Sequence, residues 1–371
     1  MRLNRFLRRT GVSLALSILA LFSGCVDPDA AGGGSTSGTA LYAFDTADGA
    51  SNRLLIWDNV AALHAADALP ANTRTISSEQ FAKVKNLAWG GLAVDGSGNR
   101  LWLVGEAGDV VKVERIRQQT GAIPTAEAIH FNLGNSGDRL NNGKFSQAAL
   151  DPVSGTLYVM ETSESEARVW VVSSPHFFNE GFIVTPGNKI GVSGDKLGTG
   201  LAAGSGGVYA FFKDGNQVQV STETFNGPRL RSGTASGFGA SSVLIGGNTK
   251  LERYGSLALD TGNNRVFIAR HNQDASSSEP PISVFTLGQF GSNPNQAPDK
   301  GTLGTAALNN LRVLAHPGNK DWLAALDATS GEAPTNLLRL FKNPSQSGSV
   351  VKTFTLGATV KLKGIALDGS A

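Results

Sequence analysis

Cysteine is almost absent from this chain: its 371 residues contain only one, Cys25. A single cysteine has no partner for an intramolecular disulfide, and no Cys-x-x-Cys-His segment is present to attach a haem. The fold must therefore be stabilised by a hydrophobic core, which about 330 residues are enough to supply.

Charge is also scarce, at 17% of residues, and it is not gathered into basic blocks. The full chain carries 32 basic and 30 acidic residues, but four of the basic ones are arginines within the first nine positions. Without that N-terminal segment the balance is 28 basic against 30 acidic residues, which is slightly acidic. We therefore expect no nucleic-acid partner.

The residue types that usually carry hydrolytic or metal chemistry form no recognisable set. No Gly-x-Ser-x-Gly elbow stands at a strand-to-helix turn, and no glycine-rich phosphate loop precedes a helix. The five histidines are scattered, without the spacing of a metal-ligand pair. They are His64, His130, His176, His271 and His316.

The N-terminal segment predicts export. Arginines at positions 2, 5, 8 and 9 precede an apolar stretch, Val12–Phe22, that is too short to span a bilayer comfortably. Ser23, Gly24 and the lone Cys25 follow, a pattern that resembles the lipobox of bacterial lipoproteins. The resemblance implies a signal peptide over residues 1–24 and a lipid-modified Cys25 that holds the mature protein to a membrane. An ordinary secretory peptide with an incidental cysteine is the alternative.

Residues 25–38 are predicted to form a flexible tether, because Asp27–Gly38 contains no apolar residue larger than alanine. Val26, rather than an aspartate, follows Cys25. In a Gram-negative host this resembles outer-membrane rather than inner-membrane lipoproteins. The expected location is therefore the cell membrane or the outer membrane, facing the periplasm or the exterior.

Aromatic residues make up 7% of the chain, yet six of them recur at a nearly constant spacing within short apolar segments. The steps between them are 60, 56, 51, 58 and 55 residues. The six residues are Tyr42, Trp102, Tyr158, Tyr209, Phe267 and Trp322. A period near 55 residues indicates an array of one repeated unit.

Each unit reads as a series of short strands. A typical unit begins with an apolar segment that ends in Asp. A Gly/Asn-rich turn follows, and then a second apolar segment that contains the aromatic residue. This order predicts a hairpin, as in 91–104 and 148–159. A third strand is predicted at 110–113, 169–172, 218–220, 282–285 and 337–340, and a weaker fourth at 128–131, 242–245 and 351–354. Four antiparallel strands repeated around an axis predict an all-β fold, the β-propeller.

The two ends of the repeat array are complementary. The first unit lacks the apolar segment in front of its aromatic strand, and the chain ends with such a segment at 364–370. We therefore expect the C-terminal strand to enter the N-terminal blade and close a single six-bladed propeller over residues 39–371. The recurring pattern resembles the six-bladed propellers of the NHL and related bacterial surface-propeller type. That resemblance implies a fold and leaves the activity open.

Basic residues recur in the connections between blades, each followed by leucine. They are Arg139, Lys196, Lys250 and Lys361. A ring of cations at the channel mouth is one candidate for binding an anionic ligand. In the alternative, the leucine packs between blades and the cation only stays in water. His271 is a further candidate, because it opens the longest predicted loop between second and third strands.

Acidic residues recur in two kinds of place. Asp95, Asp151, Asp260 and Asp368 end the inner strands, and we expect them to accept hydrogen bonds from turn amides. Others lie in the loops between second and third strands, where they either neutralise the basic residues or supply oxygen ligands to Ca²⁺. The segment 95–99 superficially resembles the start of a calcium loop, but its place in the repeat predicts a tight turn. We expect no cofactor, with Ca²⁺ as the only candidate.

The sequence therefore favours a cell-envelope lipoprotein that acts as a non-catalytic binding or assembly platform, with an envelope protein or an anionic saccharide as partner. The alternative is a calcium-dependent hydrolase of the lactonase or gluconolactonase type, which also uses six-bladed propellers. Its metal ligands would be sought among Glu106, Glu161, Asn264 and Asp327. With no haem-attachment motif, a redox role could only be that of a partner protein.

Overall fold

The computed structural model describes residues 38–46, 52–84, 86–97, 99–185, 189–191, 194–214, 218–220, 223–225, 229–244, 254–270, 282–287, 300–303, 311–318, 321–327, 337–344, 350–357 and 360–369. The predicted signal peptide, Cys25, Lys250 and His271 lie outside these ranges. Helices within them are short: α1 (Val60–Ala65) and the 3-10 turns η2 (Glu79–Lys83), η3 (Ser136–Asp138) and η4 (Pro175–Phe177). None of these helices is long and apolar enough to cross a membrane.

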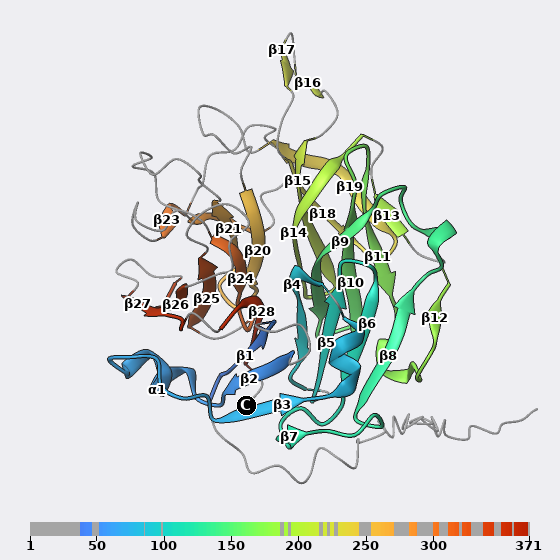
Figure 1. The fold of residues 1–371 in the computed structure, drawn as a ribbon. Coiled ribbons are helices and arrows are strands. Elements are labelled where there is room, and N and C mark those ends of the chain that lie inside the picture. The colour runs from blue at the N-terminus through green and yellow to red at the C-terminus, as the bar shows by residue number, and fades with distance from the viewer. Residues whose placement is uncertain are drawn as a thin grey trace, which may run out of the picture.

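The strands form six antiparallel sheets of four strands, which are the predicted blades (Figure 1). Blade 1 consists, from the inside outward, of β28 (Leu362–Asp368), β1 (Ala40–Asp45), β2 (Arg53–Trp57) and β3 (Arg74–Ser77). Blade 2 consists of β4 (Leu87–Asp95), β5 (Arg100–Gly105), β6 (Asp109–Val113) and β8 (Ala128–Leu133). Blade 3 consists of β9 (Lys144–Asp151), β10 (Thr156–Thr162), β11 (Ala167–Val172) and β13 (Lys189–Gly191).

The other three blades repeat this order. Blade 4 consists of β14 (Lys196–Gly204), β15 (Gly207–Asp214), β18 (Arg229–Thr234) and β19 (Gly237–Leu244). Blade 5 consists of β20 (Tyr254–Asp260), β21 (Arg265–Arg270), β22 (Ile282–Thr286) and β23 (Thr302–Leu303). Blade 6 consists of β24 (Leu311–Ala315), β25 (Trp322–Asp327), β26 (Leu337–Lys342) and β27 (Val350–Thr355).

The C-terminal strand closes the ring, which confirms the sequence prediction. β28 pairs antiparallel with β1 from Ala40↔Asp368 to Asp45↔Leu362. The inner strands contact one another in the cyclic order β28, β4, β9, β14, β20, β24 and back to β28. No gap separates the first blade from the last, so the N-terminal blade has no unpaired inner edge.

The hydrophobic core lies between the blades rather than within them. Six clusters of buried side chains are present, one at each interface between neighbouring blades. The repeated aromatic residues belong to the second strands, and Tyr42, Trp102, Tyr158 and Phe267 are almost wholly buried there. This location explains their period, because each blade contributes one such ring to the packing against its neighbour.

Blade 4 differs from the prediction in its third strand. Val218–Val220 is strand β16, which pairs only with β17 (Glu223–Phe225) in a separate hairpin. The third strand of the blade is β18, which forms five residue pairs with β15. A longer ladder and the burial of Leu230 favour β18 over the short, polar β16.

Two blades carry an extra parallel strand on their outer edge. β7 (Gly121–Ala122) pairs with β3 of blade 1, and β12 (Ile183–Val184) pairs with β8 of blade 2. Each of these strands comes from the blade that follows, so the outer edges of blades 1 and 2 are linked to their neighbours (Figure 1).

Candidate functional site

The six inner strands surround a central channel. All six run in the same direction, from the connection that enters the blade to the turn that leads into the second strand. We call the two ends of the channel the connection end and the turn end. A cavity of about 300 Å³ occupies the part toward the turn end.

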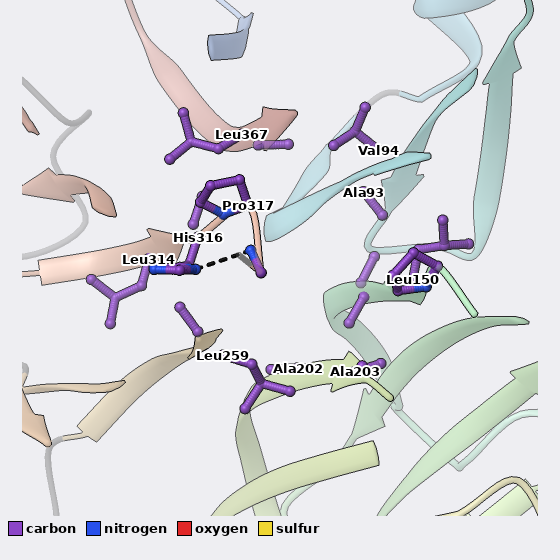
Figure 2. A pocket seen from close by; sticks show the side chains of 18 of the residues that line it. Ala93, Val94, Leu150, Ala202, Ala203, Leu259, Leu314, His316, Pro317 and Leu367 are labelled. Carbon is purple, nitrogen blue, oxygen red and sulfur yellow. Dashed lines mark hydrogen bonds between the residues drawn. The ribbon is translucent and has the colours of Figure 1, made fainter. Parts of the chain in front are cut away.

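Aliphatic side chains and main chain form most of the cavity wall. Figure 2 shows Ala93, Leu150, Ala202, Leu259, Leu314 and Leu367, which come from all six inner strands. Turn residues frame its mouth, and among them Val153 is 76% exposed. The wall therefore offers a concave surface of aliphatic side chains and main-chain groups, with few side-chain hydrogen-bonding groups.

Gln147 narrows the channel at the inner end of the cavity. Its side chain is buried and accepts a hydrogen bond from Ser256 Oγ at 3.5 Å, so it reaches from blade 3 to blade 5. Gly90 of blade 2 lies against the same amide group with φ +72°. A Cβ atom at position 90 would overlap the Gln147 amide unless that side chain moved, and the positive φ favours glycine here.

The predicted role of the strand-ending aspartates is confirmed for Asp151 and Asp260. Asp151 accepts hydrogen bonds from the Val153 amide at 3.2 Å and the Ser154 hydroxyl at 2.7 Å. Asp260 accepts from the amide and the side chain of Asn263, and Asp95 accepts from the Ser97 hydroxyl at 2.8 Å. These carboxylates stabilise the turns at the channel mouth.

Asp368 also contacts the next blade. It accepts two hydrogen bonds, at 3.1 and 2.9 Å, from the guanidinium of Arg117. Arg117 follows β6 in blade 2, so this ion pair joins the C-terminal strand to the next blade. It supports the closure of the ring.

His316 takes the place of the aspartate in blade 6. Its imidazole has no exposed surface and stacks on Phe267 of blade 5. Nδ1 accepts a hydrogen bond from the Gly318 amide at 3.0 Å (Figure 2), so the neutral ring carries its proton on Nε2. Nε2 lies 3.8 Å from a carboxylate oxygen of Asp260. Burial lowers the pKa of His316 from 6.5 to about 4, and the nearby Asp260 opposes this change.

Three of the four predicted basic residues, Arg139, Lys196 and Lys361, are described, and they lie at the connection end. The guanidinium of Arg139 donates to the carbonyl oxygens of Leu133 and Gly134 and also to that of Ala107, so it ties two loops together. Lys361 is exposed, and its amide donates to Asp45 Oδ1 at 2.8 Å. Lys196 begins β14 and is half-buried. Lys250 and His271 lie outside the described residues.

The residues considered for a hydrolase do not come together. Glu161 is fully buried, where it accepts hydrogen bonds from Arg168, Trp170 Nε1 and the Leu140 amide. Asp327 accepts two hydrogen bonds from Arg339. A carboxylate oxygen of Glu106 lies 3.6 Å from Lys144 Nζ. Asn264 has a positive φ in the turn between β20 and β21. Within the described ranges, no group of three or more His, Cys, Asp or Glu side chains is placed to hold a metal ion.

The sequence analysis missed a recurring ion pair in which the carboxylate is buried. Asp45, Glu161 and Asp327 each end or nearly end a second strand, and each pairs with an arginine of the third strand. In blade 4 the carboxylate is Asp195, just before β14, and its partner is Arg231. A signal was present in the sequence: an arginine recurs in the third strands of these four blades, at positions 53, 168, 231 and 339.

No protein-family model and no curated protein matches the sequence. Similar solved structures include a crystal structure of a nidogen/laminin complex, with a TM-score of 0.46 and 13% identity, covering 89% of this chain and 98% of that chain. They also include the hydrazine synthase of Kuenenia stuttgartiensis, with a TM-score of 0.41 and 11% identity, covering 74% of this chain and 68% of that chain. At such low similarity, neither protein's role carries over to this chain.

Proposed function

We propose that this protein is a lipid-anchored binding platform of the cell envelope, with the central channel as its recognition site. The observation that carries the proposal is the cavity of about 300 Å³, formed by all six inner strands. A concave site with mostly apolar walls and a few polar groups is the usual form of a binding pocket. Propellers in general support binding roles, since their ring displays many loops on a rigid disc.

The polar groups near this cavity have structural partners. Asp95, Asp151 and Asp260 stabilise turns, and the Gln147 amide bonds to Ser256. A group that is held by such bonds supports the shape of a site, whereas catalysis requires a group within reach of the reacting atom. These contacts favour recognition over turnover.

The anchor is proposed from the sequence, at Cys25. The 13 residues from Val26 to Gly38 would reach about 45 Å if fully extended and about 20 Å on average as a flexible coil. A propeller on such a tether stays close to the membrane but remains able to turn either channel end toward a partner. An envelope protein is the proposed partner, and the turn end is the proposed contact because the cavity lies there.

Fractionation tests the anchor. Replacing Cys25 with Ser should move the protein from the membrane fraction to the soluble fraction. Unchanged sedimentation with membranes would contradict lipid anchoring at this residue.

Site-specific crosslinking tests the platform. A photo-crosslinking amino acid at Val153, on the cavity mouth, should capture an envelope protein in cells. The matched control position is Asp67, whose side chain is fully exposed after α1 in blade 1. Equal capture at both positions, or none at Val153, would contradict a binding role for the turn end.

A further inference from the structure

The channel cavity has a floor made by contacts that cross the channel. Two such contacts lie there. Gln147 of blade 3 meets Ser256 of blade 5, and Trp89 of blade 2 packs against the hydrophobic cluster between blades 6 and 1. Counted from the connection end, the first residues of the inner strands that line the cavity are Gly90, Gln147, Leu201, Leu257, Val313 and Ile365. We call this level the floor, and a ligand reaches it from the turn end.

One side chain of the floor has an unused hydrogen-bond donor. Gln147 is 4% exposed and lines the cavity. Its Oε1 accepts a hydrogen bond from Ser256 Oγ at 3.5 Å, whereas its Nε2 has no acceptor within the described part of the chain. A donor buried without an acceptor costs free energy. The floor therefore favours an occupant that carries a hydrogen-bond acceptor.

The walls above the floor favour an aliphatic body. Figure 2 shows Leu150, Ala202 and Leu259 among the side chains around the cavity. Gln147 and Asp151 are four residues apart on β9, which corresponds to a depth of about 13 Å. The volume of about 300 Å³ equals that of about ten molecules of liquid water. A protein loop would have to enter and leave through one mouth, so this space suits one small molecule better.

The ionisable groups of the wall favour a neutral ligand. Among the described residues that line the cavity, only His316 and Asp368 are ionisable. Burial lowers the pKa of His316 to about 4, so its imidazole is neutral near neutral pH. Asp368 pairs with Arg117. No lysine or arginine lines this part of the described chain, so a carboxylate ligand would be buried without a cation beside it.

We propose that the channel cavity binds a small neutral molecule with an aliphatic chain and a carbonyl group, such as a ketone or an amide. The carbonyl oxygen accepts a hydrogen bond from Gln147 Nε2 at the floor, and the chain lies along the aliphatic wall toward the turn end. This inference rests on the proposed role of the channel as a recognition site, and it names the class of molecule that enters the cavity.

Three ligands with the same pentyl chain test the proposal on the parent protein. 2-Heptanone carries a ketone, 2-methyl-1-heptene has the same shape without an acceptor, and hexanoate carries a carboxylate. In ligand-observed NMR titrations, 2-heptanone should bind about fivefold more tightly than the alkene, as expected for one neutral hydrogen bond. Hexanoate should bind more weakly than 2-heptanone. Each CH₂ added to the ketone should tighten binding about fourfold until the chain fills the cavity.

A variant of Gln147 tests the donor. Gln147→Met has a side chain of similar length without an N–H group, so it should remove the preference for 2-heptanone over the alkene. The matched control is Gln80→Met, because Gln80 is also buried but lies in η2, away from the cavity wall. That variant should keep the preference. Thermal melting shows whether each variant is folded, and the ligand comparison on the parent protein requires no variant.

Several outcomes would overturn the proposal. Equal binding of 2-heptanone and the alkene by the parent protein, or an unchanged preference in folded Gln147→Met, would exclude the hydrogen bond. Hexanoate that binds as tightly as 2-heptanone would exclude a neutral ligand, and an affinity independent of chain length would exclude the aliphatic wall. Absence of ketone binding with intact crosslinking at Val153 would remove only this inference. Ketone binding without capture at Val153 would remove only the envelope-protein partner.

Discussion

Replacing His316 with Asn is expected to make the propeller less sensitive to acid. In the folded protein the His316 imidazole is buried between blades 5 and 6, and its pKa is lowered from 6.5 to about 4. The unfolded chain therefore binds a proton at His316 at a higher pH than the folded protein does. Stability from this residue is complete above pH 6.5 and is lost as the pH falls toward 4.

The size of the effect follows from the two pKa values. The difference between 6.5 and about 4 corresponds to about 3 kcal/mol of unfolding free energy at pH values below both. Asn should keep the local structure, because its side-chain oxygen can accept the Gly318 amide hydrogen as Nδ1 of His316 does at 3.0 Å. Asn does not titrate, so this contribution disappears while the turn remains.

Urea unfolding between pH 4.5 and 7.5 measures the effect. Carboxylates also lose stabilising interactions in acid, so the quantity of interest is the difference between the parent protein and the variant. That difference should change with pH for His316→Asn. A constant difference for His316→Asn would refute the reasoning.

Three further predictions concern closure and the buried contacts. Deleting residues 364–371 should cause aggregation or unfolding, because β1 would lose most of its partner strand. A folded monomer in size-exclusion chromatography would contradict this prediction. Glu161→Ala should lower the unfolding free energy by about 3–5 kcal/mol, because it leaves Arg168 without its buried partner. A loss of less than about 1 kcal/mol in urea unfolding would contradict this prediction. Gly90→Ala should cost at least about 1–2 kcal/mol from its positive φ alone. The double variant with Gln147→Ala should cost less than the sum of the two single changes, and strict additivity would exclude the contact between them.

The number of blades and most of their strands could be predicted because the relevant information is local. Alternating apolar residues and Gly/Asn turns identify each hairpin, and the period of the aromatic residues identifies the repeat. The closure by β28 could also be predicted, because a terminal fragment that matches the missing part of the first unit is visible in the chain itself.

The exceptions concern pairings that short segments cannot specify. Val218–Val220 has the composition of a strand, but whether it pairs with β15 or with β17 depends on competition from β18. β7 and β12 contain two residues each and pair in parallel with a different blade. Such contacts depend on the packed neighbour rather than on local propensity.

For the candidate site, the sequence by itself determined the residue types and their order along each strand: a basic residue at the start of four inner strands and an aspartate at the end of four. It indicated the turn role of Asp95, Asp151 and Asp260. Only the tertiary structure decided that Trp89 of blade 2 reaches Arg312 of blade 6 and Lys363 of blade 1. The physical reason is that these residues are more than 200 positions apart in the sequence and meet only when the ring closes. A local sequence pattern carries no information about such a contact.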